Sequence, residues 1–132
     1  MLKKTFLMIK PDAVRKNLIG EILKRTEDSG FKIMDLKMAK FSLSQARRFY
    51  RVHKGKPFFE KLVKFVSSGK IVGVLLTRRN AVEKLRELVG ATDPKEAKRG
   101  TIRRDFATNV TKNVVHASDS VQSFRFESKF FF

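Results

Sequence analysis

The sequence predicts an α/β sandwich in which helices cover a four-stranded antiparallel sheet. Short apolar runs with strand character alternate with amphipathic segments of helical period, in the order βαβααβαβ. No internal repeat or low-complexity segment interrupts this order. The 132 residues, of which 42% are hydrophobic, suit one compact domain spanning residues 1–132.

The first half of the chain contains two expected strands. Residues 5–9 form an apolar run that ends at Lys10-Pro11-Asp12, a turn signal that places Lys10 at the strand end. Apolar residues at helical spacing then predict a helix from residue 18, which Ser29-Gly30 should end. We expect the following elements to be a strand at 31–41, a short helix opened by Ser44 and ending at Tyr50, and a helix at 58–66.

The second half contains the most strand-like stretch of the chain, residues 71–76. Asn80 is expected to cap a helix through residue 89, and Ser118 or Asp119 to cap a closing helix that follows a short strand at 114–116. Residues 90–113 show little periodicity and predict a long loop, which in a compact domain is usually functional. The core of this arrangement is a ferredoxin-like βαββαβ unit.

The charge of the chain is unusually positive. Thirty Lys and Arg against 13 Asp and Glu give a net charge of +17, which implies an anionic partner. A nucleic-acid binder, a phosphate enzyme and a lysine-rich surface all remain open, but the absence of a long block of like charges argues against a disordered tail. The lack of cysteine excludes disulfides, zinc ribbons and thiol nucleophiles. Without a long apolar run or a signal peptide, the expected protein is cytoplasmic and has no membrane partner.

His116 is the residue with the strongest chemical signal. It ends an apolar strand and is followed at once by helix-capping residues, so it could meet an anion beside a helix N-terminus. Taken alone, a partly buried structural histidine is the commoner explanation. Other residues must therefore decide between the two.

Several motifs resemble those of the nucleoside diphosphate kinase family, in order and in register over essentially the whole chain. The run Asn113-x-x-His116-Ala117-Ser118-Asp119 is similar to the family's histidine motif, and Lys10-Pro11-Asp12 matches near the start. The other matches are Tyr50, Pro57-Phe58-Phe59, Arg86 with Gly90-Ala91-Thr92-Asp93-Pro94, Gly100-Thr101-Ile102-Arg103-x-Asp105-Phe106, and Glu127. Each motif is weak alone, and their common register makes the resemblance specific.

The resemblance implies reversible transfer of the terminal phosphate from a nucleoside triphosphate, typically ATP, to a nucleoside diphosphate. The transfer would be ping-pong through a phosphohistidine at His116 and would maintain nucleoside and deoxynucleoside triphosphate pools. Neutral imidazole suits this chemistry, being nucleophilic near neutral pH and a good leaving group once phosphorylated. The implied catalytic residues are His116, Glu127, Lys10, Tyr50 and Ser118. Glu127 would accept a hydrogen bond from the other ring nitrogen of His116.

The resemblance also implies a nucleotide site. Lys10, Arg86 and Arg103 would bind phosphates, with a further hydroxyl donor from Thr92. Phe58 would stack on the base opposite Val110 with Leu62 nearby, while Asn113 and Lys10 would hold the sugar. Stacking tolerates any base, so broad specificity is expected. Taken singly, Phe58 and Leu62 could be ordinary core and Glu127 a solvated glutamate.

No metal site is expected on the protein itself. The chain lacks a Gly-x-x-x-x-Gly-Lys phosphate loop and lacks a His, Cys or carboxylate cluster at metal-ligand spacing. We therefore expect Mg²⁺ to arrive bridging the nucleotide phosphates, where it neutralises and orients them.

Three positions depart from the family pattern: Arg104 and Ala117 stand where Gly is common, and Arg99 where Pro is common. Arg104 is expected to be strained if that backbone needs a positive φ. It could project into the pocket and attract nucleotides, or point to solvent or a subunit contact. The chain also ends at Phe132, where many relatives continue with a tail that packs on neighbouring subunits. A homo-oligomer built from dimers is expected, either a tetramer or a hexamer.

The alternative function is a basic nucleic-acid-binding protein without catalysis. The charge of +17 and the 13 Phe favour it, since Phe can stack on bases. Most Phe residues nevertheless fall at core positions of the expected elements. A kinase that also binds polyanions nonspecifically would combine the two.

Overall fold

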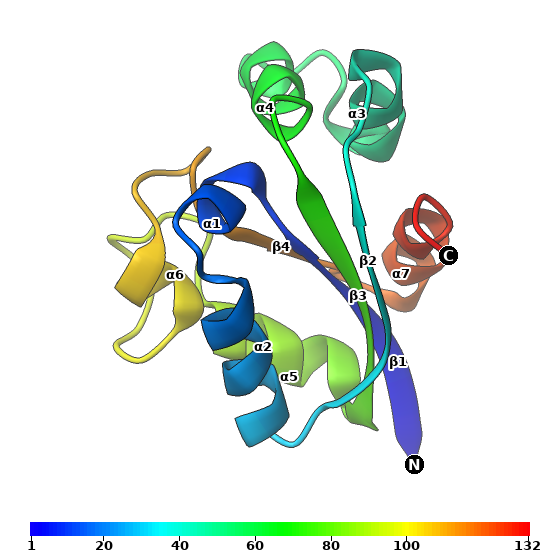
Figure 1. The fold of residues 1–132 in the computed structure, drawn as a ribbon, viewed down its shortest axis with the longest axis vertical. Helices are drawn as coiled ribbons and strands as arrows, with labels where there is room; N and C mark the ends of the chain where they lie inside the picture. Colours follow the sequence, from blue (N-terminus) through cyan, green and yellow to red (C-terminus); the bar gives the residue numbers. More distant parts are fainter.

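A computed structural model describes residues 1–132, and its centre is a four-stranded sheet (Figure 1). The strands are β1 (Leu2–Ile9), β2 (Lys32–Ala39), β3 (Ile71–Arg79) and β4 (Val115–Ala117). They lie in the order β2-β3-β1-β4, and every neighbouring pair is antiparallel. This order and the intervening helices confirm the predicted ferredoxin-like sandwich.

Seven helices and one 3₁₀ turn accompany the strands, and the last helix follows β4. They are α1 (Pro11–Arg15), α2 (Ile19–Asp28), α3 (Leu43–Phe49), the 3₁₀ turn η1 (Arg51–His53), α4 (Phe59–Val66), α5 (Ala81–Val89), α6 (Ile102–Phe106) and α7 (Val121–Ser128). α1 and α6 are not predicted from the sequence, because five residues are too few to show a helical period. The expected loop at 90–113 therefore contains a short helix. None of the helices is long and apolar enough to cross a lipid bilayer.

The helix caps differ from those expected. Ser42, not Ser44, begins α3, and its side chain forms a reciprocal capping box with Gln45. Ser120, not Ser118 or Asp119, caps α7 by accepting a hydrogen bond from the backbone N–H of Ser123. Asn80 does precede α5, but it lies in the left-handed region at φ 53° and its side chain makes no cap. Ser118 is thereby left free for another contact.

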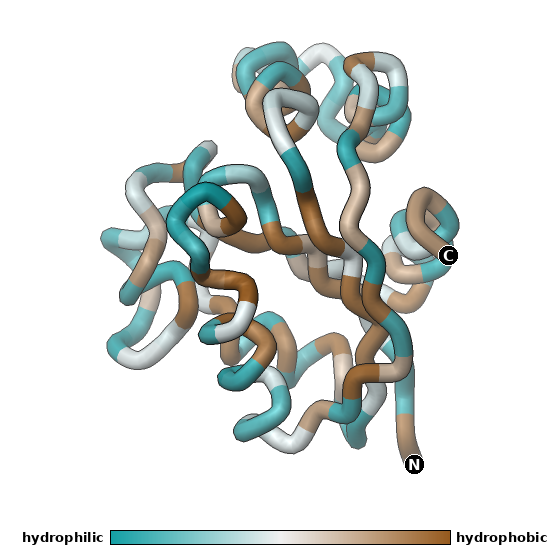
Figure 2. Tube along the Cα trace, viewed as in Figure 1, coloured by the Kyte–Doolittle hydropathy of each residue, from teal (hydrophilic) through white to brown (hydrophobic).

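Alternation along β1 divides the core between the two faces of the sheet. Leu7 and Ile9 face α2 and α5 and belong to one buried cluster, whereas Phe6 and Met8 face α3, α4 and α7 and belong to the other. Figure 2 shows the hydrophobic stretches of the strands at the centre, between these helices. Burial on both faces explains why β1 reads as a continuous apolar run.

The second cluster is unusually rich in phenylalanine. Phe131 packs against Phe6 and Phe41, with ring centroids 5.4 and 5.3 Å apart. A side chain at Gly73 would meet the Phe131 ring, since a Cβ built there lies 2.5 Å from it. Much of the phenylalanine content therefore serves packing, as the pattern predicted, and the C-terminal residues are fixed onto the sheet.

Candidate active site

A cleft of about 760 Å³ lies where α3, α4, α5, α7 and β4 meet. We call it the nucleotide pocket, after the site that the sequence resemblance implies. The structure brings together there nearly all the residues that the sequence singled out. Those lining it are Lys10, Tyr50, Phe58, Leu62, Arg86, Thr92, Arg103, Val110, Asn113, His116 and Glu127. Ser118 alone does not line the pocket, and it lies behind the wall in contact with Glu127.

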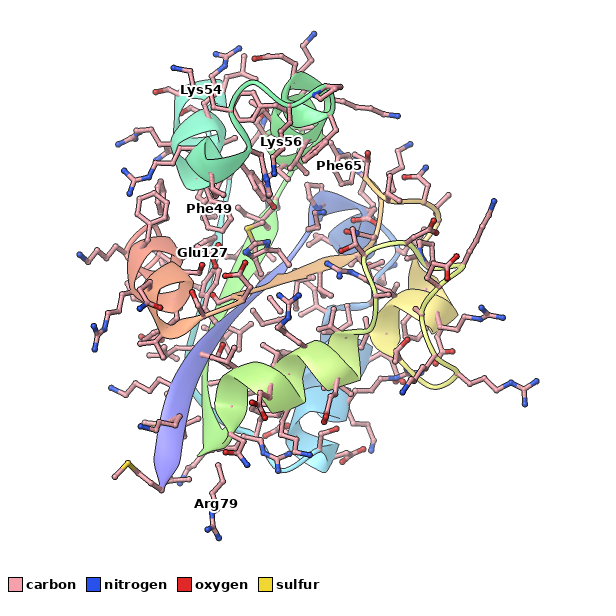
Figure 3. The ribbon with its side chains drawn as sticks, turned by 180° about the vertical axis from the view of Figure 1, so that it is seen from behind. Phe49, Lys54, Lys56, Phe65, Arg79 and Glu127 are labelled. Carbon is pink, nitrogen blue, oxygen red and sulfur yellow. The ribbon has the colours of Figure 1, made fainter.

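The imidazole of His116 sits at the end of a buried polar chain. Its Nε2 lies 2.8 Å from Oε2 of Glu127, although the ring N–H is not aligned with that oxygen well enough to form a hydrogen bond. The Ser118 hydroxyl, in the turn between β4 and α7, donates to the other Glu127 oxygen at 2.5 Å and so holds the carboxylate in position. Glu127 projects from α7 close to Phe49, whose ring packs edge-on against His116 (Figure 3). This arrangement leaves Nδ1 as the ring nitrogen available to the pocket.

The backbone before His116 is strained. Val114 has φ 66°, a left-handed conformation that is a genuine outlier for a β-branched residue. Its N–H donates to Oδ2 of the buried Asp12 at 3.1 Å, and its carbonyl accepts from the Lys10 N–H at 2.8 Å. The sequence pattern predicts Asp12 only as part of a turn. Its place in α1 is what lets it hold the strand that carries His116.

Lys10 is a buried cation at the end of β1. Its ammonium donates to Oδ1 of Asn113 at 2.7 Å and to the Thr111 carbonyl at 3.2 Å, and neither partner carries a charge. Burial, together with nearby Arg103 and against the pull of Asp12, lowers the pKa of Lys10 to about 7. An anion entering the pocket would supply the missing counter-charge.

Arg103 is fixed by the loop rather than by acidic partners. Its guanidinium donates to the carbonyls of Gly90 at 3.2 Å and Val115 at 2.7 Å. Gly90 has φ 91°, and a Cβ there would lie 2.6 Å from Thr101, so only glycine fits this turn. Burial lowers the pKa of Arg103 to about 10, and Arg86 contributes to this shift. With Lys10 and Arg86, the pocket holds three cations, and none of them forms an ion pair with the acidic lining residues Asp119 and Glu127.

Tyr50 contributes a hydroxyl without a partner. The residue is almost fully buried, and its oxygen makes no hydrogen bond. Burial, with the neighbouring Glu127 carboxylate, raises the pKa of Tyr50, so the phenol stays protonated and remains a donor. Its ring packs edge-on against His116, with centroids 5.6 Å apart.

The mouth of the pocket is apolar and open. Phe58 and Val110 are 44% and 54% exposed, so neither is a core residue, and the core explanation of Phe58 is wrong. Leu62 is a core residue and a pocket residue at once, because it belongs to the buried cluster and also lines the pocket. His53 is a lining residue that the sequence analysis missed, packed on Tyr50 and Phe58. Burial, then Lys56 and His116, lower its pKa. In the sequence, His53 could have been singled out only by its position between the matched Tyr50 and Pro57-Phe58-Phe59.

The departures from the family pattern are accommodated without strain. Arg104 lies inside α6 and Ala117 in β4, and neither has a positive φ, so the expected strain at Arg104 is absent. The Arg104 guanidinium donates to the Lys95 carbonyl and does not line the pocket. The account in which Arg104 attracts nucleotides from inside the pocket is therefore wrong. Nothing in the structure explains Arg99.

Comparisons with known proteins identify the family of this chain. A sequence model of the nucleoside diphosphate kinase family matches residues 3–132. The nucleoside diphosphate kinase of Fervidobacterium nodosum is 50% identical over 99% of this chain and 89% of its own length. The crystal structure of the Aquifex aeolicus enzyme superposes with a TM-score of 0.96 at 41% identity, covering 100% of this chain and 96% of that one.

A third relative was solved with a nucleotide bound. It is a halophilic nucleoside diphosphate kinase from Halobacterium salinarum in complex with CDP, with a TM-score of 0.95 at 36% identity. That alignment covers 100% of this chain and 88% of the relative. With the family match spanning nearly the whole sequence, this chain belongs to the nucleoside diphosphate kinase family.

Proposed function

We propose that the protein transfers the terminal phosphate of a nucleoside triphosphate to a nucleoside diphosphate through a phosphohistidine at His116. The observation that carries this proposal is the pairing of His116 Nε2 with Glu127 beside three cations that have no acidic partner. A histidine held in this way presents one nitrogen to an anion and has a carboxylate behind the other.

In the first half-reaction, Nδ1 of His116 attacks the terminal phosphorus of the triphosphate. The new N–P bond forms as the P–O bond to the diphosphate breaks, and the diphosphate departs with that electron pair. Glu127 stabilises the positive charge that develops on the ring, and Ser118 fixes the carboxylate. The second half-reaction reverses these steps with a second nucleoside diphosphate. Its terminal phosphate oxygen attacks the phosphorus of the phosphohistidine, and the N–P bond breaks.

The cations and the Tyr50 hydroxyl act on the transferring group. Phosphoryl transfer is catalysed mainly by positioning and by stabilising the charge on the phosphate oxygens. Lys10, Arg86 and Arg103 supply the positive charges that stabilise these oxygens. Thr92 and Tyr50 supply hydroxyl donors. No group of three or more His, Asp or Glu side chains is placed to hold a metal, so Mg²⁺ is proposed to enter on the nucleotide phosphates.

The direct test of this function is incubation with γ-labelled ATP in the absence of an acceptor. The protein is expected to retain phosphate that is labile in acid and stable in base, and a nucleoside diphosphate should remove it as triphosphate. Nothing in the family match or in the relatives above favours the alternative of a nucleic-acid-binding protein without catalysis.

Phe58 is proposed to be the platform on which the base stacks, with Val110 opposite and Leu62 below. Phe58→Ala should weaken nucleotide binding about tenfold or more, because stacking contributes about 1–3 kcal/mol per base. The melting temperature should hardly change, since the ring is 44% exposed. Isothermal titration calorimetry and thermal melts measure the two quantities. A large fall in melting temperature with unchanged affinity would contradict this role.

Asn113 and Lys10 are proposed to contact the sugar.

Assembly from dimers is proposed to use β2. This strand lies at the edge of the sheet with unpaired backbone groups, and Met34, Leu36 and Met38 are 51%, 48% and 47% exposed. An exposed apolar edge strand is a template for pairing with a second copy. Leu36→Glu should lower the mass measured by light scattering, while Leu43→Glu, a matched change on α3, should not. An unchanged mass for Leu36→Glu would exclude β2 as the contact. Whether dimers build a tetramer or a hexamer follows from the wild-type mass.

A further inference from the structure

A second hollow, of about 840 Å³, adjoins the nucleotide pocket, and we call it the basic groove. Its walls come from α3, η1, the start of α4, and α7 with the residues that follow it, and the segment at residues 54–57 joins η1 to α4. The same stretch of chain serves both sites: His53 and Phe58 line the nucleotide pocket, whereas Lys54 and Lys56 line the groove. Lys54 and Lys56 lie at the α3–α4 end of the molecule, far from Arg79 at the opposite end (Figure 3).

The groove is strongly positive and only one of its cations is neutralised. Five basic side chains line it, Arg47, Arg48, Arg51, Lys54 and Lys56, against one acidic residue, Glu60. Glu60 pairs with Arg47 at 3.2 Å. The other four cations have no carboxylate partner. None of the five lines the nucleotide pocket, so the proposed kinase reaction does not account for them.

The wall formed by α7 and the residues that follow it is aromatic, and two of the arginines lie over it. The Arg51 guanidinium carbon is 4.0 Å from the centroid of the Phe126 ring, and that of Arg48 is 5.9 Å from the Phe130 ring. The two rings meet edge-on with centroids 5.3 Å apart. An arginine held over an aromatic ring presents a flat, charged surface, on which a nucleobase can stack. The groove thus offers stacking planes and phosphate donors together.

We propose that the basic groove binds single-stranded nucleic acid. The lysines and arginines would contact successive phosphates, and unpaired bases would stack on the Arg51–Phe126 pair. A chain of phosphates alone would need the cations but not the aromatic wall, and an apolar peptide would not need four free cations. A duplex keeps its bases stacked inside and has none to offer. The interaction adds to the kinase reaction and does not depend on His116.

The test uses the full chain and a fluorescein-labelled oligothymidylate, with binding followed by fluorescence anisotropy. The triple variant Arg48→Glu, Arg51→Glu, Lys54→Glu should lose most of the affinity. Each phosphate contact contributes about 0.7 to the slope of log K against log salt for single strands. The triple variant loses the contacts of all three side chains, so its slope should be shallower than that of the wild type by about 2. Phosphoenzyme formation from ATP should be unchanged, which also shows that the variant is folded.

A matched control carries the same change of charge elsewhere. Lys3→Glu, Lys4→Glu, Arg79→Glu reverses three exposed cations at the far end of β1 and β3 and should bind as the wild type does. Equal losses in the two triple variants would mean that net charge alone attracts the strand, and would overturn the groove. So would retained affinity in the groove variant.

A second variant separates nucleic acid from other polyanions. Phe126→Leu keeps every charge but removes the ring beneath Arg51, so it should weaken oligothymidylate binding about tenfold, as loss of one stacked base does. Inorganic polyphosphate can use the cations but not the stacking surface, so it should bind the wild type more weakly than the oligonucleotide does, and its affinity should not change in Phe126→Leu. If polyphosphate competes as well as the oligonucleotide and Phe126→Leu binds normally, the ligand is a phosphate chain and the proposal fails.

Discussion

His116→Ala is expected to abolish both phosphoenzyme labelling from γ-labelled ATP and nucleotide turnover. The variant has no nitrogen at the position that Glu127 orients, and no cysteine is present to act in its place. The measurement is acid-labile, base-stable radiolabel on the protein, together with the rate of triphosphate formation from a diphosphate acceptor. The loss should be limited only by the detection threshold, because covalent transfer needs the nucleophile itself.

His53 provides the matched control for this experiment. It is the only other histidine, and it lies in the same pocket, stacked on Tyr50. His53→Ala should keep its label even if nucleotide affinity changes, because its ring is not paired with Glu127. Labelling that survives in His116→Ala, or that disappears only in His53→Ala, would show that His116 is not the nucleophile.

Lys10→Met is expected to slow phosphoenzyme formation by about 10²–10³-fold, the usual effect of removing one charged or hydrogen-bonding group aimed at a transition state. The melting temperature should not fall sharply, because methionine replaces a buried cation that has no acidic partner in direct contact. Single-turnover kinetics and thermal melts measure the two effects. Lys112 is exposed and lies between Thr111 and Asn113, the two partners of Lys10. Lys112→Met should change neither quantity. Normal phosphorylation in Lys10→Met would remove Lys10 from the mechanism.

Nucleotide affinity should also depend on pH through Lys10. Its pKa is about 7 in the free protein, and a bound phosphate favours the charged form, so the pKa is higher in the complex. Below pH 7 the ammonium is already charged and adds no pH dependence. Above pH 7 binding must take up a proton, so affinity should fall by up to about tenfold per pH unit. Calorimetry in two buffers of different ionisation enthalpy measures this uptake, which should vanish in Lys10→Met.

Local pattern alone predicted much of the fold. β1, β3 and β4 could be recognised because buried β-strands give short apolar runs, and the largely exposed β2 because its apolar and polar residues partly alternate. α2, α4 and α5 could be recognised because an amphipathic helix repeats its apolar face every three to four residues. Position in shared motifs, not periodicity, singled out His116 and Glu127. Sequence likeness located these residues but carried no information about which nitrogen of His116 meets the carboxylate.

The short helices and caps were decided by tertiary contacts. α1 and α6 each have five residues, too few for a period, and they are held by contacts such as Asp12 with Val114 and Arg25 with Asp105. Ser118 could have capped α7 on local grounds, but burial beside Glu127 gives its hydroxyl a charged partner, and Ser120 caps the helix instead. A hydrogen bond to a charged group outweighs one to a neutral N–H.

The sequence by itself determined the sheet, its two apolar faces, and the motif positions that identify the family. Only the tertiary structure decided that Arg104 points away from the pocket, that Val114 is strained, and that Arg48 and Arg51 lie over Phe130 and Phe126. The reason is that periodicity depends on neighbours along the chain. Charge, burial and pKa depend on groups that folding brings together from distant segments, as Lys10 and Asn113 meet across 103 positions.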